Sequence, residues 1–183
     1  MDLNKIKLRT YVDYRVGNVI QIKGKLGFRV TVIFDDMEEK ECQHSGFLKK
    51  EEAEKERNRI IAQLHDKKYV VYKNVKLEEL LVYWLENIIR NKEGISASTY
   101  HTYKNCIDNH IIPELGKLTL LKLNQGHILK LYKKLVANYS SIPRIVKPIM
   151  NTSLEFALSK NLITYNPAAE LCLPRNAKKT PYH

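Results

Sequence analysis

Hydroxyl, amide and cationic side chains gather at two places in the second part of the sequence, each at the expected start of a helix. The strings are ISASTYHTYKN (95–105) and SSIPRIVK (140–147). Free backbone N–H groups and the helix dipole attract anions at a helix start, and hydroxyls and cations add to this attraction. Both places are therefore suited to holding the phosphates of a nucleic acid. The candidate contact residues are Ser98, Thr99, Thr102, Lys104, Asn105, Ser141, Arg144 and Lys147.

Four more cations are candidates outside these strings. Lys117 lies in an expected connector between helices. Lys23, Lys25 and Arg29 lie on or beside expected strands, and a small sheet can place one face in the major groove of DNA. Strand-edge lysines also block aggregation, so this structural role is the alternative for them.

Two residues of the helix-start strings illustrate the range of roles. Asn105 is placed to read a base edge, because an amide pairs well with adenine. Arg144 is the strongest single candidate for a DNA contact, and its alternative is a surface ion pair of little energetic value. Ser98 and Thr99 have helix capping as their alternative role.

The charge balance favours an anionic partner. The 183 residues include 31 Lys and Arg against 20 Asp and Glu, a formal net charge of +11. Residues 70–183 hold 16 Lys and Arg against 8 Asp and Glu, whereas residues 1–69 hold 15 against 12. Phosphate neutralisation needs several cations together, so the second part is the better candidate for a polyanion surface.

Several other functions are not expected from this sequence. The cysteines Cys42, Cys106 and Cys172 are odd in number and far apart, which indicates neither a disulfide framework nor a zinc site. No apolar run approaches the roughly 18 residues that cross a bilayer, and the N-terminus has no apolar signal core. Phosphate-binding glycine loops and paired-carboxylate sites are also missing. We expect a cytoplasmic protein without cofactor, membrane contact or small-molecule substrate.

The elements that must position the candidates divide into two units. Residues 1–69 predict a small three-stranded sheet with one helix, after a polar lead-in. Strands at 19–25 and 28–34 form a hairpin whose short connection is bracketed by Gly24 and Gly27, and 40–44 is a third strand. The sparse apolar residues of 49–67 predict a helix on the sheet.

Residues 70–172 predict a four-helix bundle, which makes the fold class α+β. Pro113 is expected to end the second helix, and Pro148 to bend the fourth or remove one hydrogen bond. Residues 173–183 have no periodicity and are expected to form a linker. The expected caps are Ser96 or Ser98 for the second helix, Asn124 for the third, and Ser140 or Ser141 for the fourth.

The helical unit resembles the core-binding domain of tyrosine recombinases, the phage-type integrases. The strings that carry the resemblance are Trp84-Leu85, ISASTYHTY (95–103), HIIPELG (110–116), and NLITYNPA (161–168) followed by LCLP (171–174). Their order and spacing match the family from residue 84 to residue 174. The first unit resembles the arm-binding domain of the family through GFLKKEEAE (46–54).

The resemblance implies the DNA-binding part of a site-specific recombinase from a phage or mobile element. The helical unit would hold a core site and the first unit arm sites on double-stranded DNA, with other recombinase subunits as further candidate partners. The family's catalytic domain uses a tyrosine nucleophile with arginines, a lysine and a histidine. Its His-x-x-Arg pair does not occur in this sequence. We therefore expect no catalysis by this chain and a linker leading toward an absent catalytic domain.

Two alternatives remain open from the residues. The bundle can be a helical module that binds another protein, in which case exposed apolar residues should gather on it. The chain can also be a stand-alone DNA-binding regulator derived from an integrase.

Overall fold

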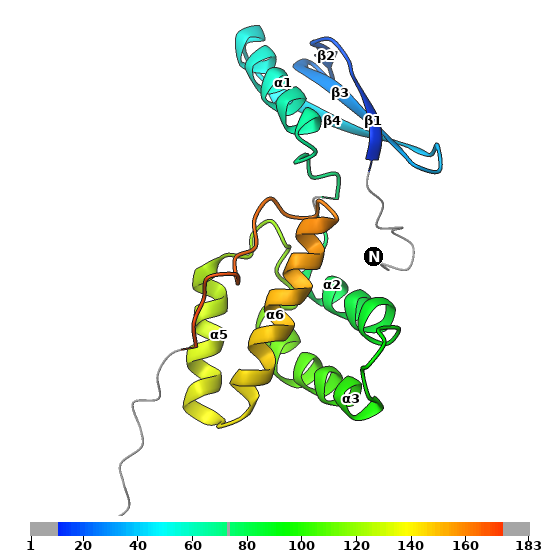
Figure 1. Ribbon diagram of the computed structural model, residues 1–183. Coiled ribbons are helices and arrows are strands. Elements are labelled where there is room, and N and C mark those ends of the chain that lie inside the picture. The colour runs from blue at the N-terminus through cyan, green and yellow to red at the C-terminus, as the bar shows by residue number, and fades with distance from the viewer. Residues whose placement is uncertain (1–10, 73, 174–183) are drawn as a thin grey trace, which may run out of the picture. The chain divides into compact units, whose positions relative to one another are not determined.

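The computed structural model describes residues 11–72 and 74–173 (Figure 1). The described residues form two compact units that meet in the sequence between Val71 and Tyr72. The sheet unit, residues 11–71, is an antiparallel sheet with one helix, and the helical unit, from residue 72 on, is all α. The predicted α+β class is confirmed. Except for Leu173, the expected linker 173–183 lies outside the described residues.

The sheet has four strands rather than the three that we expected. They are β1 Tyr11–Val16, β2 Ile20–Ile22, β3 Lys25–Phe34 and β4 Glu39–Phe47. β3 is central and every pairing is antiparallel: β1 and β2 pair with successive parts of β3, and β4 also pairs with β3.

The expected polar lead-in is wrong, because part of it forms β1. The pairing register of β1 shifts between Tyr11 and Asp13. Tyr11 is buried and Val12 is exposed, while Tyr14 and Val16 are half-buried. The irregularity breaks the alternation of period two by which a strand is recognised in a sequence.

The hairpin between β2 and β3 turns earlier than expected. Its two loop residues are Lys23 and Gly24, and both have positive φ, 52° and 79°. Positive φ at both positions is typical of a type I′ turn, whose twist suits a two-residue hairpin. Gly27 lies inside β3, where an added Cβ would come within 2.5 Å of the His44 carbonyl oxygen. Gly27 therefore serves close strand pairing and does not bound the turn.

One face of β3 forms the core of the sheet unit together with α1, Lys50–His65. Full burial of one such apolar side chain stabilises the fold by about 1.5–3 kcal/mol. The buried residues are Phe28, Val30, Val32 and Phe34 from β3, and Ala53, Ile60 and Leu64 from α1.

The helical unit contains five α-helices among its described residues, arranged as four continuous stretches. The bounds are α2 Leu77–Trp84 with the π-helical segment η1 Leu85–Ile89; α3 Ala97–Cys106, η2 Ile107–Ile111 and α4 Ile112–Leu115; α5 Gln125–Asn138; and α6 Ile142–Ser159.

The second stretch does not end at Pro113 as expected. Pro113 occupies the first turn of α4, where a helix needs no backbone N–H from it. In the preceding η2 segment the N–H of Ile112 donates to the carbonyl of Ile107, five residues back. The wider turn of η2 lets the helix continue past Pro113, where the sequence predicts its end, and the helix ends at Leu115.

α6 is the central helix of the unit and packs against α2, α3 and α5 (Figure 1). Tyr132 of α5 and Ile149 and Met150 of α6 are fully buried. The helix continues through Pro148, which has no N–H to offer the carbonyl of Arg144. No helix among the described residues is long and apolar enough to span a bilayer.

Candidate nucleic-acid interface

The start of α3 is capped by Ser96. Its hydroxyl accepts a hydrogen bond from the Thr99 N–H at 3.1 Å and lies 2.9 Å from the Thr99 hydroxyl. This arrangement satisfies one of the free N–H groups of the first turn, while the others need partners from solvent or ligand. Ser98 is exposed and Thr99 half-buried beside this cap. The cap assignment to Ser96 is confirmed, and Ser98 is left with its hydroxyl in solvent.

A polar stripe runs along the exposed side of α3. Ser98, Thr102 and Asn105 are separated by four and then three residues, which places them on one helix face. The Thr102 hydroxyl donates to the Ser98 carbonyl at 2.9 Å, and Asn105 accepts a hydrogen bond from the Asn109 amide. The stripe is uncharged and has donors and acceptors of the kind that contact phosphates and base edges.

Lys104 lies on a different flank of α3. Its ammonium donates to the Asp108 carboxylate at 2.8 Å, and this hydrogen bond holds the pKa of Lys104 above its usual value. An exposed pair of this spacing contributes only about 0.3–0.5 kcal/mol. The positive charge of Lys104 is nevertheless matched locally, which weakens it as a partner for a phosphate.

The start of α6 presents cations without such partners. Ser141 and Arg144 are exposed and Lys147 is half-buried. No carboxylate among the described residues pairs with Arg144 or Lys147. Ser141 precedes the helix as expected, although its side chain makes no capping hydrogen bond.

The surroundings of Arg144 reveal a signal that the sequence reasoning missed. No Asp or Glu occurs between Glu114 and Glu155, whereas this run contains seven Lys and Arg. It covers the connector after α4, all of α5 and most of α6. Lys134 alone among the seven has an ion-pair partner among the described residues, Glu114. The seven are Lys117, Lys122, Lys130, Lys133, Lys134, Arg144 and Lys147.

We call residues 115–154 the acid-free segment. The predicted site residue Lys117 is exposed within it. Lys130 and Lys133 are exposed on α5, opposite the buried Ile128 and Leu131. A count of acids along the sequence would have added these lysines to Arg144 as candidate DNA contacts.

The candidates of the sheet unit divide into two kinds. Lys23 lies in the β2–β3 turn and Lys25 begins β3, and both are exposed. Arg29 lies on the sheet face opposite α1, 3.6 Å from Glu41. Arg15 pairs with Glu39 on the same face, to which the register also assigns Asp13. The alternation of β3 adds Lys25 to this open face, so its three acids match its three cations, in contrast to the acid-free segment.

An apolar hollow of about 280 Å³ is lined by α2 and η1, the loop after η1, α3 and α6. Trp84 stacks on Tyr103 at its wall, with 6.3 Å between ring centroids. The lining residues are Trp84, Ile88, Ile89, Lys92, Ile95, Tyr103, Pro148, Thr152 and Phe156.

Comparison with known proteins identifies part of the helical unit. Residues 76–136 match the family described as phage integrase, N-terminal SAM-like domain. The solution NMR structure of an integrase-like domain from Bacillus cereus is similar, with 25% identity and a TM-score of 0.51 over 61% of this chain and 94% of that one.

A second solution NMR structure, of a fragment 61–160 from Clostridium leptum, shares the fold. It has 19% identity and a TM-score of 0.51, and the likeness covers 60% of this chain and 97% of that one. No curated protein matches the chain. Residues 76–136 are thus similar to the N-terminal SAM-like domain of phage integrases.

Proposed function

We propose that the helical unit binds duplex DNA as the core-binding part of a site-specific tyrosine recombinase of a phage or other mobile element. The observation that carries this proposal is the acid-free segment, which adds unpaired cations on α5 and α6 to a domain of integrase type. Several adjacent cations neutralise several phosphates and release the counterions condensed on DNA.

Arg144 and Lys147 are the proposed phosphate contacts at the start of α6. Arg144 offers a planar fork of donors to phosphate oxygens, and Lys147 offers a point charge one turn further on. Lys117, Lys130 and Lys133 extend the contact. The polar stripe of Ser98, Thr102 and Asn105 is proposed to follow the backbone, with Asn105 placed to read an adenine edge.

The chain binds and positions DNA in this proposal and performs no strand cleavage itself. The sheet unit is proposed to hold a separate, arm-type DNA site, in keeping with the resemblance of residues 46–54. The proposed partners are accordingly double-stranded DNA at two kinds of site and other recombinase subunits.

The experiment that tests the proposal is a salt titration of duplex binding by the whole chain. The double variant Arg144→Gln/Lys147→Gln should lower the log–log salt slope by about 1.8, since each phosphate contact contributes about 0.9. The matched control is Arg90→Gln, which removes an exposed charge already paired with Glu86 at 3.0 Å. Equal slopes for the double variant and the parent would refute the proposal.

A protein partner is the second candidate function, and the apolar hollow lined by α2, η1, α3 and α6 favours it. Val82 on α2 and Leu158 on α6 add exposed apolar area, and Ile88 of the lining is itself exposed. Such area supports contact with another protein when it is continuous. Thr152→Lys would place a charge in the hollow, so loss of self-association with unchanged DNA binding would favour this second function.

A further inference from the structure

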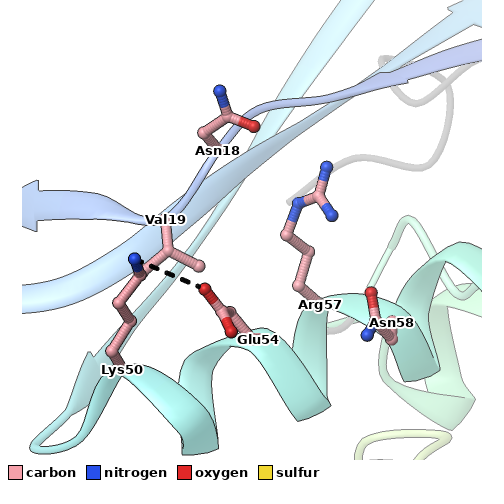
Figure 2. Close-up of a pocket in the computed structure, with 6 residues that line it drawn as sticks. All are labelled: Asn18, Val19, Lys50, Glu54, Arg57 and Asn58. Carbon is pink, nitrogen blue, oxygen red and sulfur yellow. Dashed lines mark ion pairs between the residues drawn. The ribbon is translucent and has the colours of Figure 1, made fainter.

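A polar pocket lies inside the sheet unit, on the helix side of the sheet (Figure 2). It has a volume of about 520 Å³. The loop between β1 and β2 contributes Asn18 and Val19, and α1 contributes one helix face. The α1 residues are Lys50, Glu54, Arg57 and Asn58. Lys50, Glu54 and Asn58 are four residues apart and Arg57 is three residues after Glu54, which places them on one side of the helix.

Arg57 is the cation that this pocket holds in position. Its Nε donates to the Gly17 carbonyl at 2.8 Å, and Figure 2 shows the side chain reaching from α1 toward the loop of Asn18. Within the described part of the chain, the remaining guanidinium N–H groups have no hydrogen-bond acceptor. A guanidinium fixed at Nε keeps its Nη edge free for an oxyanion, and a planar fork suits two oxygens of one phosphate.

The neighbouring charges leave Arg57 uncompensated. Glu54 is the acid that lines the pocket, and it pairs with Lys50 at 3.7 Å. Arg59, two residues further along α1, differs because its Nε and one Nη nitrogen both donate to the Glu56 carboxylate, at 2.7 and 2.6 Å. The helix therefore offers two arginines with the same formal charge, one free to bind an anion and one already engaged.

The two asparagines complete the lining. Asn18 lies on the loop and Asn58 on α1, next to Arg57. Neither side-chain amide makes a hydrogen bond to another described residue. Each amide can donate to an anion, so the pocket combines one oriented fork with two flanking donors.

We propose that this pocket binds a phosphate group, with Arg57 as the bidentate ligand and Asn18 and Asn58 as flanking donors. The same chemistry suits a phosphodiester of duplex DNA and a free phosphate. The duplex source rests on the proposed DNA-binding function, whereas the free-phosphate source does not. The pocket also gives the sheet unit an anion site away from its open face, where Glu39, Glu41 and Asp13 oppose Arg15 and Arg29.

The test uses the whole chain and two probes, inorganic phosphate and duplex DNA. Phosphate is titrated at constant ionic strength against chloride, and the amide NMR signals of Gly17, Asn18 and Asn58 are followed. We expect saturable shifts in the parent and in Arg59→Gln, and their loss in Arg57→Gln. Duplex binding is then measured against salt, where Arg57→Gln should lower the log–log slope by about 0.9 and Arg59→Gln should leave it unchanged.

Asn58→Ala guards against a folding defect, because it leaves the Arg57–Gly17 hydrogen bond intact. It should weaken phosphate binding about tenfold to a hundredfold, the effect of losing one hydrogen bond to a charged group. If Arg57→Gln loses its NMR dispersion, the result for Asn58→Ala decides.

The possible outcomes separate the two sources. A DNA phosphodiester is supported as the ligand if Arg57→Gln loses the phosphate-induced NMR shifts and also lowers the log–log salt slope of duplex binding by about 0.9. Loss of the shifts with unchanged duplex binding supports a free phosphate. Shifts that do not saturate, or that respond equally to Arg57→Gln and Arg59→Gln, overturn the proposal. Failure of the parent chain to bind any duplex would refute the proposed function, and the phosphate titration would still decide on the pocket.

Discussion

The sheet unit and the helical unit differ in how far their positive charges are matched by nearby acids. Residues 11–71 contain 12 Lys and Arg and 11 Asp and Glu, and several cations are matched across strands or along α1, as in Arg15–Glu39 and Arg59–Glu56. The acid-free segment contains seven cations and no acid. The contrast teaches that the local supply of acids, more than the total number of lysines, indicates where a polyanion can bind.

The sharpest way to break this contrast is to introduce acids where the sequence has none. Lys130→Glu/Lys133→Glu reverses two exposed charges on α5. We expect duplex affinity to fall by about a hundredfold at low salt, because two phosphate contacts become repulsive. Fluorescence anisotropy with a labelled duplex measures the effect. Lys49→Glu/Lys55→Glu in the sheet unit reverses two exposed charges that do not line the polar pocket and is the matched control; an equal loss there would show that total charge alone decides.

A smaller effect is expected from releasing a matched cation. Asp108→Asn removes the carboxylate that pairs with Lys104, and duplex affinity should rise about threefold to fivefold because the lysine becomes available. Lys104→Gln should change affinity by less than about twofold, since its charge is already compensated. The same anisotropy titration compares the two, and a large loss in Lys104→Gln would show that the ion pair opens on binding.

The open face of the sheet allows the comparison to be tested from the other side. Glu39→Gln/Glu41→Gln removes two acids and frees Arg15 and Arg29. Duplex affinity should increase by about twofold, with a slightly steeper salt dependence. No change would mean that this face stays away from DNA even when its cations are free.

The smallest effect on binding should come from the buried hydroxyl of Tyr132. This hydroxyl has no hydrogen-bond partner among the described residues, and burial raises its pKa to about 12. Tyr132→Phe removes an unsatisfied polar group, so the free energy of unfolding should rise by about 1 kcal/mol while DNA binding stays unchanged.

The raised pKa of Tyr132 also predicts a pH effect. The unfolded chain loses this proton near the ordinary value of 10, whereas the folded chain keeps it up to about 12. Stability is therefore complete below pH 10 and falls between pH 10 and about 12. Urea unfolding at several alkaline pH values should show a shallower fall for Tyr132→Phe than for the parent.

The sequence predicted those features that depend on short-range patterns. The apolar periodicity of α2, the caps at Ser96 and Asn124, and the helix over Lys50–His65 follow from residues close together in the chain. β1 was missed because its register shift hides the alternation of inward and outward residues. The helix through Pro113 was missed because η2 is a backbone adjustment that has no distinct composition.

The candidate site was predictable in its elements and less so in its energetics. Exposure of Arg144 and Ser98 at helix starts could be expected from helical spacing. The pairing of Arg29 with Glu41 depends on strand register, which pairs β3 with β4 and was not predicted. The absence of acids from residues 115–154 can be read from the sequence. The structure adds that α5 and α6, which carry most of these cations, pack against each other.

Pro148 has a mechanical consequence for α6. The Arg144 carbonyl therefore lacks the hydrogen bond that an N–H at position 148 would donate. The backbone that carries Arg144 and Lys147 depends more on the burial of Pro143 and Val146 for its position than an unbroken helix would.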